Sequence, residues 1–298
     1  APAAPMTRAM LVTVLHRLED TPAAKADAAF PDVDAAAWYA DAVAWASGNG
    51  IVTETTGTAL VAAAVTRSPI FPQEHPVTIY RHAVRGEYVC LPISNTAGMA
   101  LRWFRDQFCA EERMEAEKTG VDSYVLLDKE AAAVAPGAEG VIFLPYLMGE
   151  RSPLLDETCQ GVFFGLSARH ERAHLLRGVM EGVAYSQRAC MDVFREMGLE
   201  PQAMKLCGGG QILADQFRLP VTTMASGESP TLGAAILAGV CAGVYPDVPS
   251  GCKIVGDGGT LECPQKEVAR VYDAGYEIYR SLYPALRQQF AALVQMKL

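Results

Sequence analysis

Apolar side chains recur at helical spacing in several stretches of the chain. Two long stretches predict a helix over about 171–197, ended by Gly198, and a final helix over about 265–296. Shorter stretches predict further helices over 97–108, 211–218 and 231–242, and charged, exposed helical segments up to about residue 134.

Other stretches have the composition and length of strands. Residues 58–66, 77–84 and 87–94 are rich in Val, Ile, Thr and Tyr, and the tight Arg85-Gly86 turn predicts a hairpin between the last two. Residues 141–146 form a continuous apolar run, which is typical of a buried strand. Short strands are also expected over 204–207 and 220–224. Three strands, a helix, and then alternating strands and helices predict a mixed α/β domain.

The first 52 residues differ in composition from the rest, because they are unusually rich in alanine. Met10, Val14 and Leu18 share one helix face, and Trp38 and Trp45 share another. Gly48-Asn49-Gly50 would end the second helix. A pair of helices of this size is too small to be stable alone. We therefore predict a small helical module over 1–54 and a larger domain over 57–298.

Composition restricts the classes of partner. Half of the 298 residues are hydrophobic, and the net charge of −9 argues against nucleic acid and anionic membranes as partners. No run reaches the roughly 18 apolar residues of a membrane span. The N-terminal residues show no signal-peptide pattern, although a removed one would leave no trace. The eight cysteines are scattered without metal-site spacing, which favours free thiols, a cytoplasmic location and no bound metal.

Two glycine turns are candidates for binding phosphate. Gly208, Gly209 and Gly210 follow a short apolar strand, and Gly57-Thr58 opens the first hairpin. Backbone N–H groups can approach phosphate oxygens where no side chain intervenes. The alternative for residues 208–210 is a tight turn between a strand and a helix.

The longest informative stretch reads GVIFLPYLMGERSPLLD from Gly140, followed by GVFFGLSARHERAHLLRGVMEGVAY from Gly161. It resembles the second domain of the FGGY carbohydrate kinases, xylulokinases above all, and the resemblance extends over about 57–298. The resemblance implies a ribonuclease-H-like fold of the actin and sugar-kinase superfamily. It also implies transfer of the γ-phosphate of ATP, with Mg²⁺, to a hydroxyl group of a pentulose.

The same resemblance implies roles for particular residues. Gly57, Thr58, Gly208, Gly209 and Gly210 match phosphate and nucleotide turns of the family. Gly98 and Arg102 match positions that face the nucleotide, although a helix packed through its glycine, with a solvated arginine, is the alternative. Glu150 and Arg151 would face the interdomain cleft or form a local ion pair of little energy. His174 is expected to be structural or capping, and the loop Gly256 to Thr260 to be an ordinary surface loop.

The sequence also departs from the family pattern. Ala59 and Leu60 stand where Ser and Gly usually follow the Gly-Thr pair, and a loop of several residues after Gly210 is shortened. In the family, the first domain carries the first phosphate loop and most of the sugar contacts. The general base is an Asp just upstream of the Gly-Thr loop, a place that the N-terminal helical segment occupies here. We therefore expect nucleotide binding without competent catalysis, and either self-association or a partner that supplies the first domain. A gene remnant without function is a further alternative.

The N-terminal segment resembles an S-layer homology module. The matching residues are Thr7-Arg8-Ala9, FPDVDAAAWYADAVAWA from Phe30, and Asn49 to Val52. In that family a Thr-Arg-Ala-Glu motif binds cell-wall polysaccharide, whereas Met10 stands here in place of the Glu. This resemblance implies a second hypothesis, a surface-associated protein that binds the cell wall through Thr7 and Arg8. The alternative is a plain pair of helices.

Overall fold

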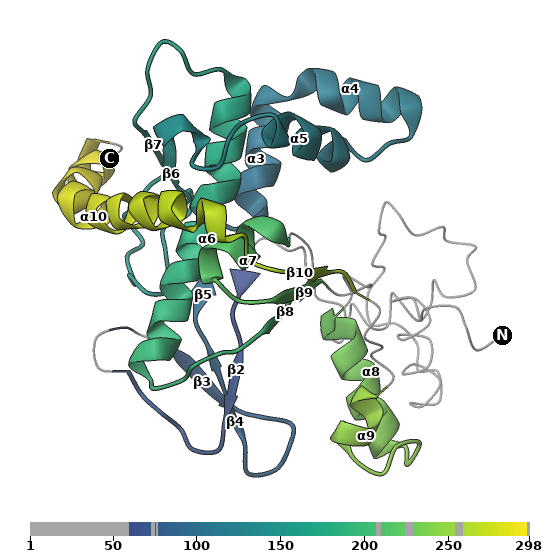
Figure 1. Ribbon diagram of the computed structural model, residues 1–298. Helices are drawn as coiled ribbons and strands as arrows, with labels where there is room; N and C mark the ends of the chain where they lie inside the picture. The colour runs from purple at the N-terminus through teal and green to yellow at the C-terminus, as the bar shows by residue number, and fades with distance from the viewer. Residues whose placement is uncertain are drawn as a thin grey trace. The chain divides into compact units, whose positions relative to one another are not determined.

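The computed structural model describes residues 60–72, 75, 77–206, 210–223, 229–253 and 259–296. Contacts group 60–223 with 259–296 into one unit, and 229–253 belong to another (Figure 1). The predictions for residues 1–59, including the helical module over 1–54, lie outside the described residues. The boundary predicted between that module and the domain over 57–298 therefore stays a prediction.

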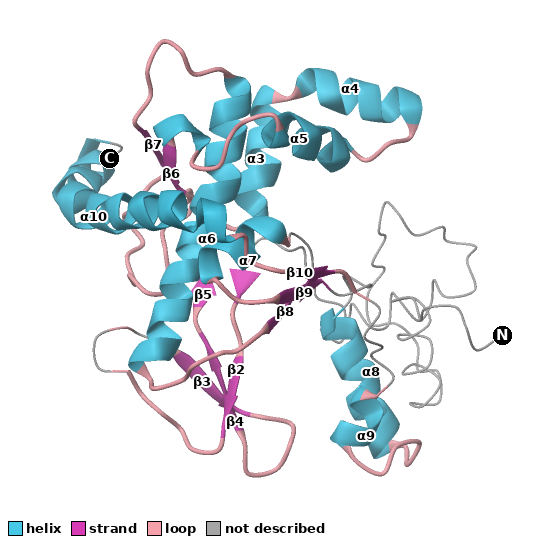
Figure 2. Cartoon of the chain, in the orientation of Figure 1, coloured by secondary structure: helices cyan, strands magenta, loops and turns pink. Residues whose placement is uncertain are grey.

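The larger unit alternates strands and helices along the chain (Figure 2). Its strands are β1 (Leu60–Val61), β2 (Ala64–Thr66), β3 (Thr78–Arg81), β4 (Tyr88–Leu91), β5 (Ile93–Ser94), β6 (Ile142–Leu144), β7 (Val162–Phe164), β8 (Met204–Leu206), β9 (Val221–Thr223) and β10 (Leu261–Glu262). Its helices are α3 (Gly98–Phe108), α4 (Ala110–Thr119), α5 (Ser123–Ala132), the 3-10 turn η1 (Ala138–Gly140), α6 (Arg172–Glu196), α7 (Gln211–Phe217) and α10 (Lys266–Met296). The mixed α/β class predicted from the sequence is confirmed.

The first three predicted strands are present, but two of them are divided. β3 and β4 form the expected antiparallel hairpin, with Tyr80 opposite Val89, and β2 pairs with the other edge of β4. β1 pairs separately with β5. Pro92 separates β4 from β5 because proline has no N–H to donate to a neighbouring strand. The Pro92 carbonyl instead accepts from the N–H of Ala62, at the break between β1 and β2 (3.2 Å).

Strand β6 is the buried centre of the unit, as its apolar run predicted. Successive side chains of a strand point to opposite faces. Ile142 and Leu144 accordingly pack with tyrosines of α10. Phe143 packs on the other side, with residues of α3, α5 and α6. β6 therefore lies between two helical layers.

Helix α6 links the three apolar clusters of the unit. Leu176 belongs to the cluster around Phe143, Tyr185 to the tyrosine cluster with α10, and Phe194 to the cluster beneath β8 and β9. Its close approach to β6 depends on Gly182, where an added Cβ would lie 2.2 Å from the Phe143 carbonyl oxygen. The helix ends before Gly198, which has the positive φ of 73° typical of such an end.

The chain after α6 builds a second small sheet. β8 and β9 are parallel and joined by α7, and β10 pairs antiparallel with β9. In the other unit, α8 (Ser229–Cys241) packs against α9 (Val248–Cys252). Asp247 caps α9 by accepting from the N–H of Ser250 (2.8 Å). Three of these short elements, β7, β10 and α9, were not predicted from the sequence.

Candidate functional site

Helix α3 begins without a capping side chain. Its N-cap residue, Ala97, is buried and has no side-chain oxygen to accept from the N–H groups of the first turn. The first residue of the helix, Gly98, is exposed, and Arg102 follows one turn later on the same face. The N–H of Ala100 donates to the carbonyl of Ala97 (3.0 Å). The N–H groups before it and the positive end of the helix dipole favour an anion. A nucleotide role for Gly98 and Arg102 stays a prediction.

The turn that leads into α3 is held by the carboxylate of Glu150. Glu150 is 2% exposed. Its Oε1 accepts from the backbone N–H groups of Asn95 (2.8 Å) and Arg151 (2.8 Å). Its Oε2 accepts from the hydroxyl groups of Ser94 (2.9 Å) and Ser186 (3.3 Å). The carboxylate thereby joins the end of β5, the loop after β6 and the middle of α6.

Burial raises the pKa of Glu150 above its ordinary value, and the four hydrogen bonds partly oppose that rise. No cation takes part among the described residues. The ion pair with Arg151 that was considered from the sequence is therefore not formed. Arg151 is exposed, and its Nη2 donates to the hydroxyl group of Thr78 (3.3 Å). A role for Glu150 and Arg151 at an interdomain cleft stays a prediction.

Gly210 precedes the first turn of α7 and lies close to the neighbouring strands. An added Cβ at Gly210 would lie 2.7 Å from Cγ of Glu262 and 3.2 Å from Cγ2 of Thr223. The packing of this turn against β9 and β10 accounts for a glycine at position 210. Both the turn predicted over 208–210, of which only Gly210 is described, and a nucleotide role for Gly210 stay predictions.

Six of the predicted site residues lie outside the described residues. They are Thr7, Arg8, Gly57, Thr58, Gly208 and Gly209, and their roles stay predictions. Most of the Gly256 to Thr260 loop lies outside as well. Within the described ranges, no cluster of three or more His, Cys, Asp or Glu side chains could hold a metal ion. No helix in these ranges is long and apolar enough to cross a membrane.

Two smaller predictions can be compared with the structure. His174 was expected to be structural or capping, and its Nδ1 accepts from the N–H of Glu171 at the start of α6 (3.1 Å), which confirms a capping role. All seven described cysteines are free thiols, as their scattered positions predicted.

Sequence reasoning missed the hydroxyl groups around Glu150. Ser94 and Ser186 are both buried, and the Ser186 hydroxyl donates to that of Ser94 (2.8 Å). A polar Ser94-Asn95-Thr96 run directly after an apolar strand was the available signal for the first of them. The sequence has no comparable signal for Ser186, which lies in the middle of a long helix.

A model of the C-terminal domain of the FGGY family of carbohydrate kinases matches residues 51–242 of the chain. The chain belongs to this family. Its ribonuclease-H-like fold, predicted from the sequence, is confirmed by solved sugar kinases of the same fold. The xylulose kinase of Rhodospirillum rubrum is 28% identical, with a TM-score of 0.65 over 79% of this chain and 47% of that one.

Curated relatives include kinases named for more than one substrate. A gluconokinase of Bacillus licheniformis is 33% identical over 67% of this chain and 40% of its own length. A xylulose kinase of Staphylococcus epidermidis is 28% identical over 88% of this chain and 53% of its own length. The chain thus spans about half the length of the curated relatives that it matches. None of these matches supports the S-layer resemblance, which stays a prediction.

Proposed function

We propose that this chain is the nucleotide-binding part of an ATP-dependent carbohydrate kinase that resembles xylulokinases. The reaction of the whole kinase would transfer the γ-phosphate of ATP to a hydroxyl group of a pentulose. The observation that carries the proposal is the uncapped, exposed start of α3, with Gly98 and Arg102, in a chain that belongs to the FGGY family. Relatives named both gluconokinase and xylulose kinase make the sugar the less supported part of the proposal.

Nucleotide binding in this proposal depends on backbone donors and one cation. The first N–H groups of α3 would donate to phosphate oxygens, and the Arg102 guanidinium would neutralise phosphate charge. The turns at 57–58 and 208–210 would add further backbone donors. Glu150 is a positioning residue here, because it holds the turn before Gly98 without facing the ligand.

Mg²⁺ is part of the proposal only through the nucleotide. The described residues contain no cluster of acidic side chains or histidines that could hold the ion. Mg²⁺ usually keeps several waters and is bound by substrate phosphates with one or two carboxylates. The described residues therefore do not fit a magnesium site of their own, and no catalytic step is assigned to the ion.

We further propose that this chain binds nucleotide without turning it over by itself. By resemblance, the first phosphate loop belongs to the first domain of the family and the general base lies just upstream of the Gly-Thr pair. Both would come from a further segment or a partner chain. Positioned bases and phosphate donors each contribute large factors to phosphoryl transfer. The free thiols favour a reducing, cytoplasmic setting.

Calorimetric titration with MgATP tests the proposal. Gly98→Asp places a negative charge at the phosphate position, while an acidic residue in the first turn favours the helix itself. Arg102→Gln removes the cation. We expect each variant to bind at least about tenfold more weakly, which is the scale of one charge-assisted hydrogen bond. Arg113→Gln, an exposed position on α4, is the matched control and should bind as the wild type does.

Two results would contradict the proposal. Equal MgATP affinity in wild type, Gly98→Asp and Arg102→Gln would show that the start of α3 binds no phosphate. ATP-dependent phosphorylation of D-xylulose by the chain alone would refute the absence of turnover.

A further inference from the structure

The sheet formed by β2, β4 and β3 has one face on the core and one apolar face that is exposed. Cys90 and its partners on β2 and β3 pack in the apolar cluster around Phe194. Because successive side chains of a strand alternate between faces, the next cross-strand row, Val65, Val89 and Tyr80, points outward. Val65 is 51% exposed and Tyr80 is 54% exposed. We call this row, with the cations at its end, the sheet face.

Three exposed cations lie at one end of this sheet. Arg67 directly follows β2, Arg81 ends β3, and Arg85 lies in the turn between β3 and β4. β2 and β3 both run antiparallel to β4, so their last residues lie together. None of the three cations forms an ion pair within the described part of the chain. Glu87 is the only acidic side chain among the described residues of 60–91, and its Oε2 lies 3.3 Å from Nδ1 of a histidine in the same hairpin. The sheet face therefore combines an apolar row with an excess of positive charge.

The helical hairpin of α4 and α5 has the opposite charge. Residues 110–132 contain seven acidic and three basic side chains, a net charge of −4. On α4, the exposed side chains of Glu115 and Glu117 lie on either side of Met114 around the helix. Met114 is 52% exposed, and Val125 of α5 is 44% exposed. We call this surface the hairpin face, and it combines exposed apolar side chains with an excess of negative charge.

The two faces lie at opposite ends of the larger unit (Figure 1). The sheet packs against the end of α6, around Phe194, whereas α4 and α5 lie at its start, where Arg172 forms ion pairs with both helices. At 1.5 Å per residue of helix, about 33 Å separate these two positions of α6. The sheet face and the hairpin face of one molecule therefore cannot contact each other.

We propose that the sheet face of one molecule binds the hairpin face of a second copy of this chain. Each face exposes apolar side chains beside charges of one sign, and the two signs are complementary. The net charge of −9 disfavours nucleic acid and anionic membranes as occupants of the sheet face. An acidic and partly apolar protein surface fits it, and the hairpin face is such a surface on the same chain.

The proposed contact is head-to-tail, because it joins two different surfaces. Each molecule in a pair keeps one free face of each kind, so the contact can continue into a chain or close into a ring. The apolar row is short, so we expect a weak association that salt weakens further.

Sedimentation velocity of the full chain tests the contact, at concentrations from about 10 to about 300 µM because small interfaces give weak complexes. The sheet variant combines Arg81→Glu with Arg85→Glu, and the hairpin variant combines Glu115→Arg with Glu117→Arg. The wild type should sediment faster as its concentration rises. Each variant alone should associate at least about tenfold more weakly, because like charges then face each other. An equimolar mixture of the two variants should associate again, because the intact hairpin face of one meets the intact sheet face of the other.

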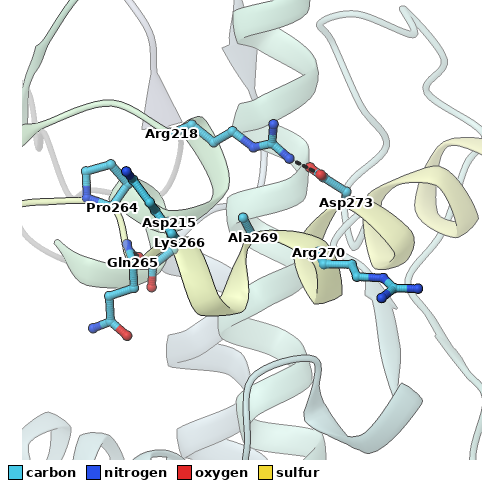
Figure 3. Close-up of a pocket in the computed structure, with 8 residues that line it drawn as sticks. All are labelled: Asp215, Arg218, Pro264, Gln265, Lys266, Ala269, Arg270 and Asp273. Carbon is cyan, nitrogen blue, oxygen red and sulfur yellow. Dashed lines mark hydrogen bonds and ion pairs between the residues drawn. The ribbon is translucent and has the colours of Figure 1, made fainter.

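A second pair of substitutions controls for net charge. Lys266→Glu combined with Arg270→Glu changes the net charge as much as the sheet variant does, and both side chains are exposed. They line the cavity shown in Figure 3, whose lining includes no residue of the sheet face or the hairpin face. This control should associate as the wild type does. Tyr80→Ala removes apolar surface without a change of charge, and it should weaken the association.

Several results would overturn the inference. A wild type that stays monomeric over the whole concentration range would do so, as would association that the sheet and hairpin variants leave unchanged. A mixture of the two variants that fails to associate would show that these two faces do not bind each other. Binding of the wild type to phosphatidylserine vesicles that the sheet variant loses would assign the sheet face to a membrane instead. The substituted side chains are exposed, so thermal unfolding of the variants should match the wild type, and Arg85→Glu alone replaces the sheet variant if it does not.

Discussion

Replacement of Glu150 by alanine removes the acceptor that holds the turn before α3. The N–H groups of Asn95 and Arg151 and the hydroxyl of Ser94 would each lose a partner. A buried donor left without an acceptor costs about 1–3 kcal/mol. Two of these donors are only partly buried, so we expect a loss of about 3 kcal/mol in the free energy of unfolding.

Glu150→Gln is the matched comparison, because the amide keeps one acceptor oxygen for the two backbone N–H groups. Its nitrogen can donate to the hydroxyl oxygens of Ser94 and Ser186, which can reorient their protons. We expect the glutamine variant to lie within about 1 kcal/mol of the wild type. Glu117→Ala, at an exposed position of α4, should change stability by less than about 0.5 kcal/mol.

The pH dependence of stability distinguishes the effect of the Glu150 charge from the effect of its hydrogen-bonding shape, because Glu150→Gln keeps the shape without the titratable group. Because burial raises the pKa of Glu150 in the folded state, the protonated form is favoured there. The contribution of this pKa difference to the free energy of unfolding is fully present below the ordinary pKa near 4.5. It is lost as pH rises through the raised pKa of the folded state. Over that window the wild type should lose stability relative to Glu150→Gln.

Urea unfolding monitored by circular dichroism measures these differences in the free energy of unfolding. Titration with MgATP measures whether loss of the Glu150 acceptor also weakens nucleotide binding at the start of α3. The alanine variant should bind MgATP more weakly than the glutamine variant, because only glutamine keeps the acceptor. If alanine and glutamine variants unfold within about 0.5 kcal/mol of each other, the reasoning about unsatisfied donors is wrong.

Three further predictions concern packing, reactivity and a surface network. Gly182→Ala places a Cβ 2.2 Å from the Phe143 carbonyl oxygen and should cost about 1–3 kcal/mol in thermal unfolding. Gly178→Ala should cost less, because its nearest contacts are a Val141 methyl group at 3.1 Å and the Val141 carbonyl oxygen at 3.4 Å. Equal costs would contradict the close packing of α6 on β6. Arg172→Gln should speed hydrogen exchange in α4 and α5, because Arg172 forms ion pairs with acidic residues of both helices. Unchanged exchange would show that these ion pairs do not stabilise the two helices. Thiol alkylation of the folded chain should modify the exposed cysteines Cys241, Cys252 and Cys263 and spare the buried cysteines Cys90, Cys109, Cys159 and Cys190. Burial raises the pKa of Cys109 to about 11, so modification of the buried thiols before unfolding would show that the core opens readily.

The long elements could be predicted closely from the sequence because their patterns repeat many times. Helix α6 was predicted over 171–197 and found over Arg172–Glu196, since its apolar face recurs over seven turns and a glycine stops it. β7 has only three residues between two glycines, which is too short for any periodicity to be distinguished. β10 and α9 were missed for the same reason.

The site was less predictable because its contacts join distant segments. Glu150 next to Arg151 suggested a local ion pair. Instead, its carboxylate accepts from the hydroxyl groups of Ser94, 56 residues before it, and Ser186, 36 residues after it. Whether a glutamate is buried depends on which segments fold over it, and sequence spacing carries little information about that. Gly98 and Arg102, by contrast, could be proposed from the resemblance to the FGGY kinases, and one helix turn places them on the same face.

Hydrogen exchange of the chain with and without MgADP tests the central claim most directly. If the start of α3 binds nucleotide phosphate, MgADP should slow exchange in peptides that cover residues 96–102, and also in peptides over 207–213 where the glycine turn leads into α7. Peptides from α4, which has no buried residue, should exchange as before. Unchanged exchange over 96–102 at saturating MgADP would contradict the claim that this chain carries the nucleotide site of a carbohydrate kinase.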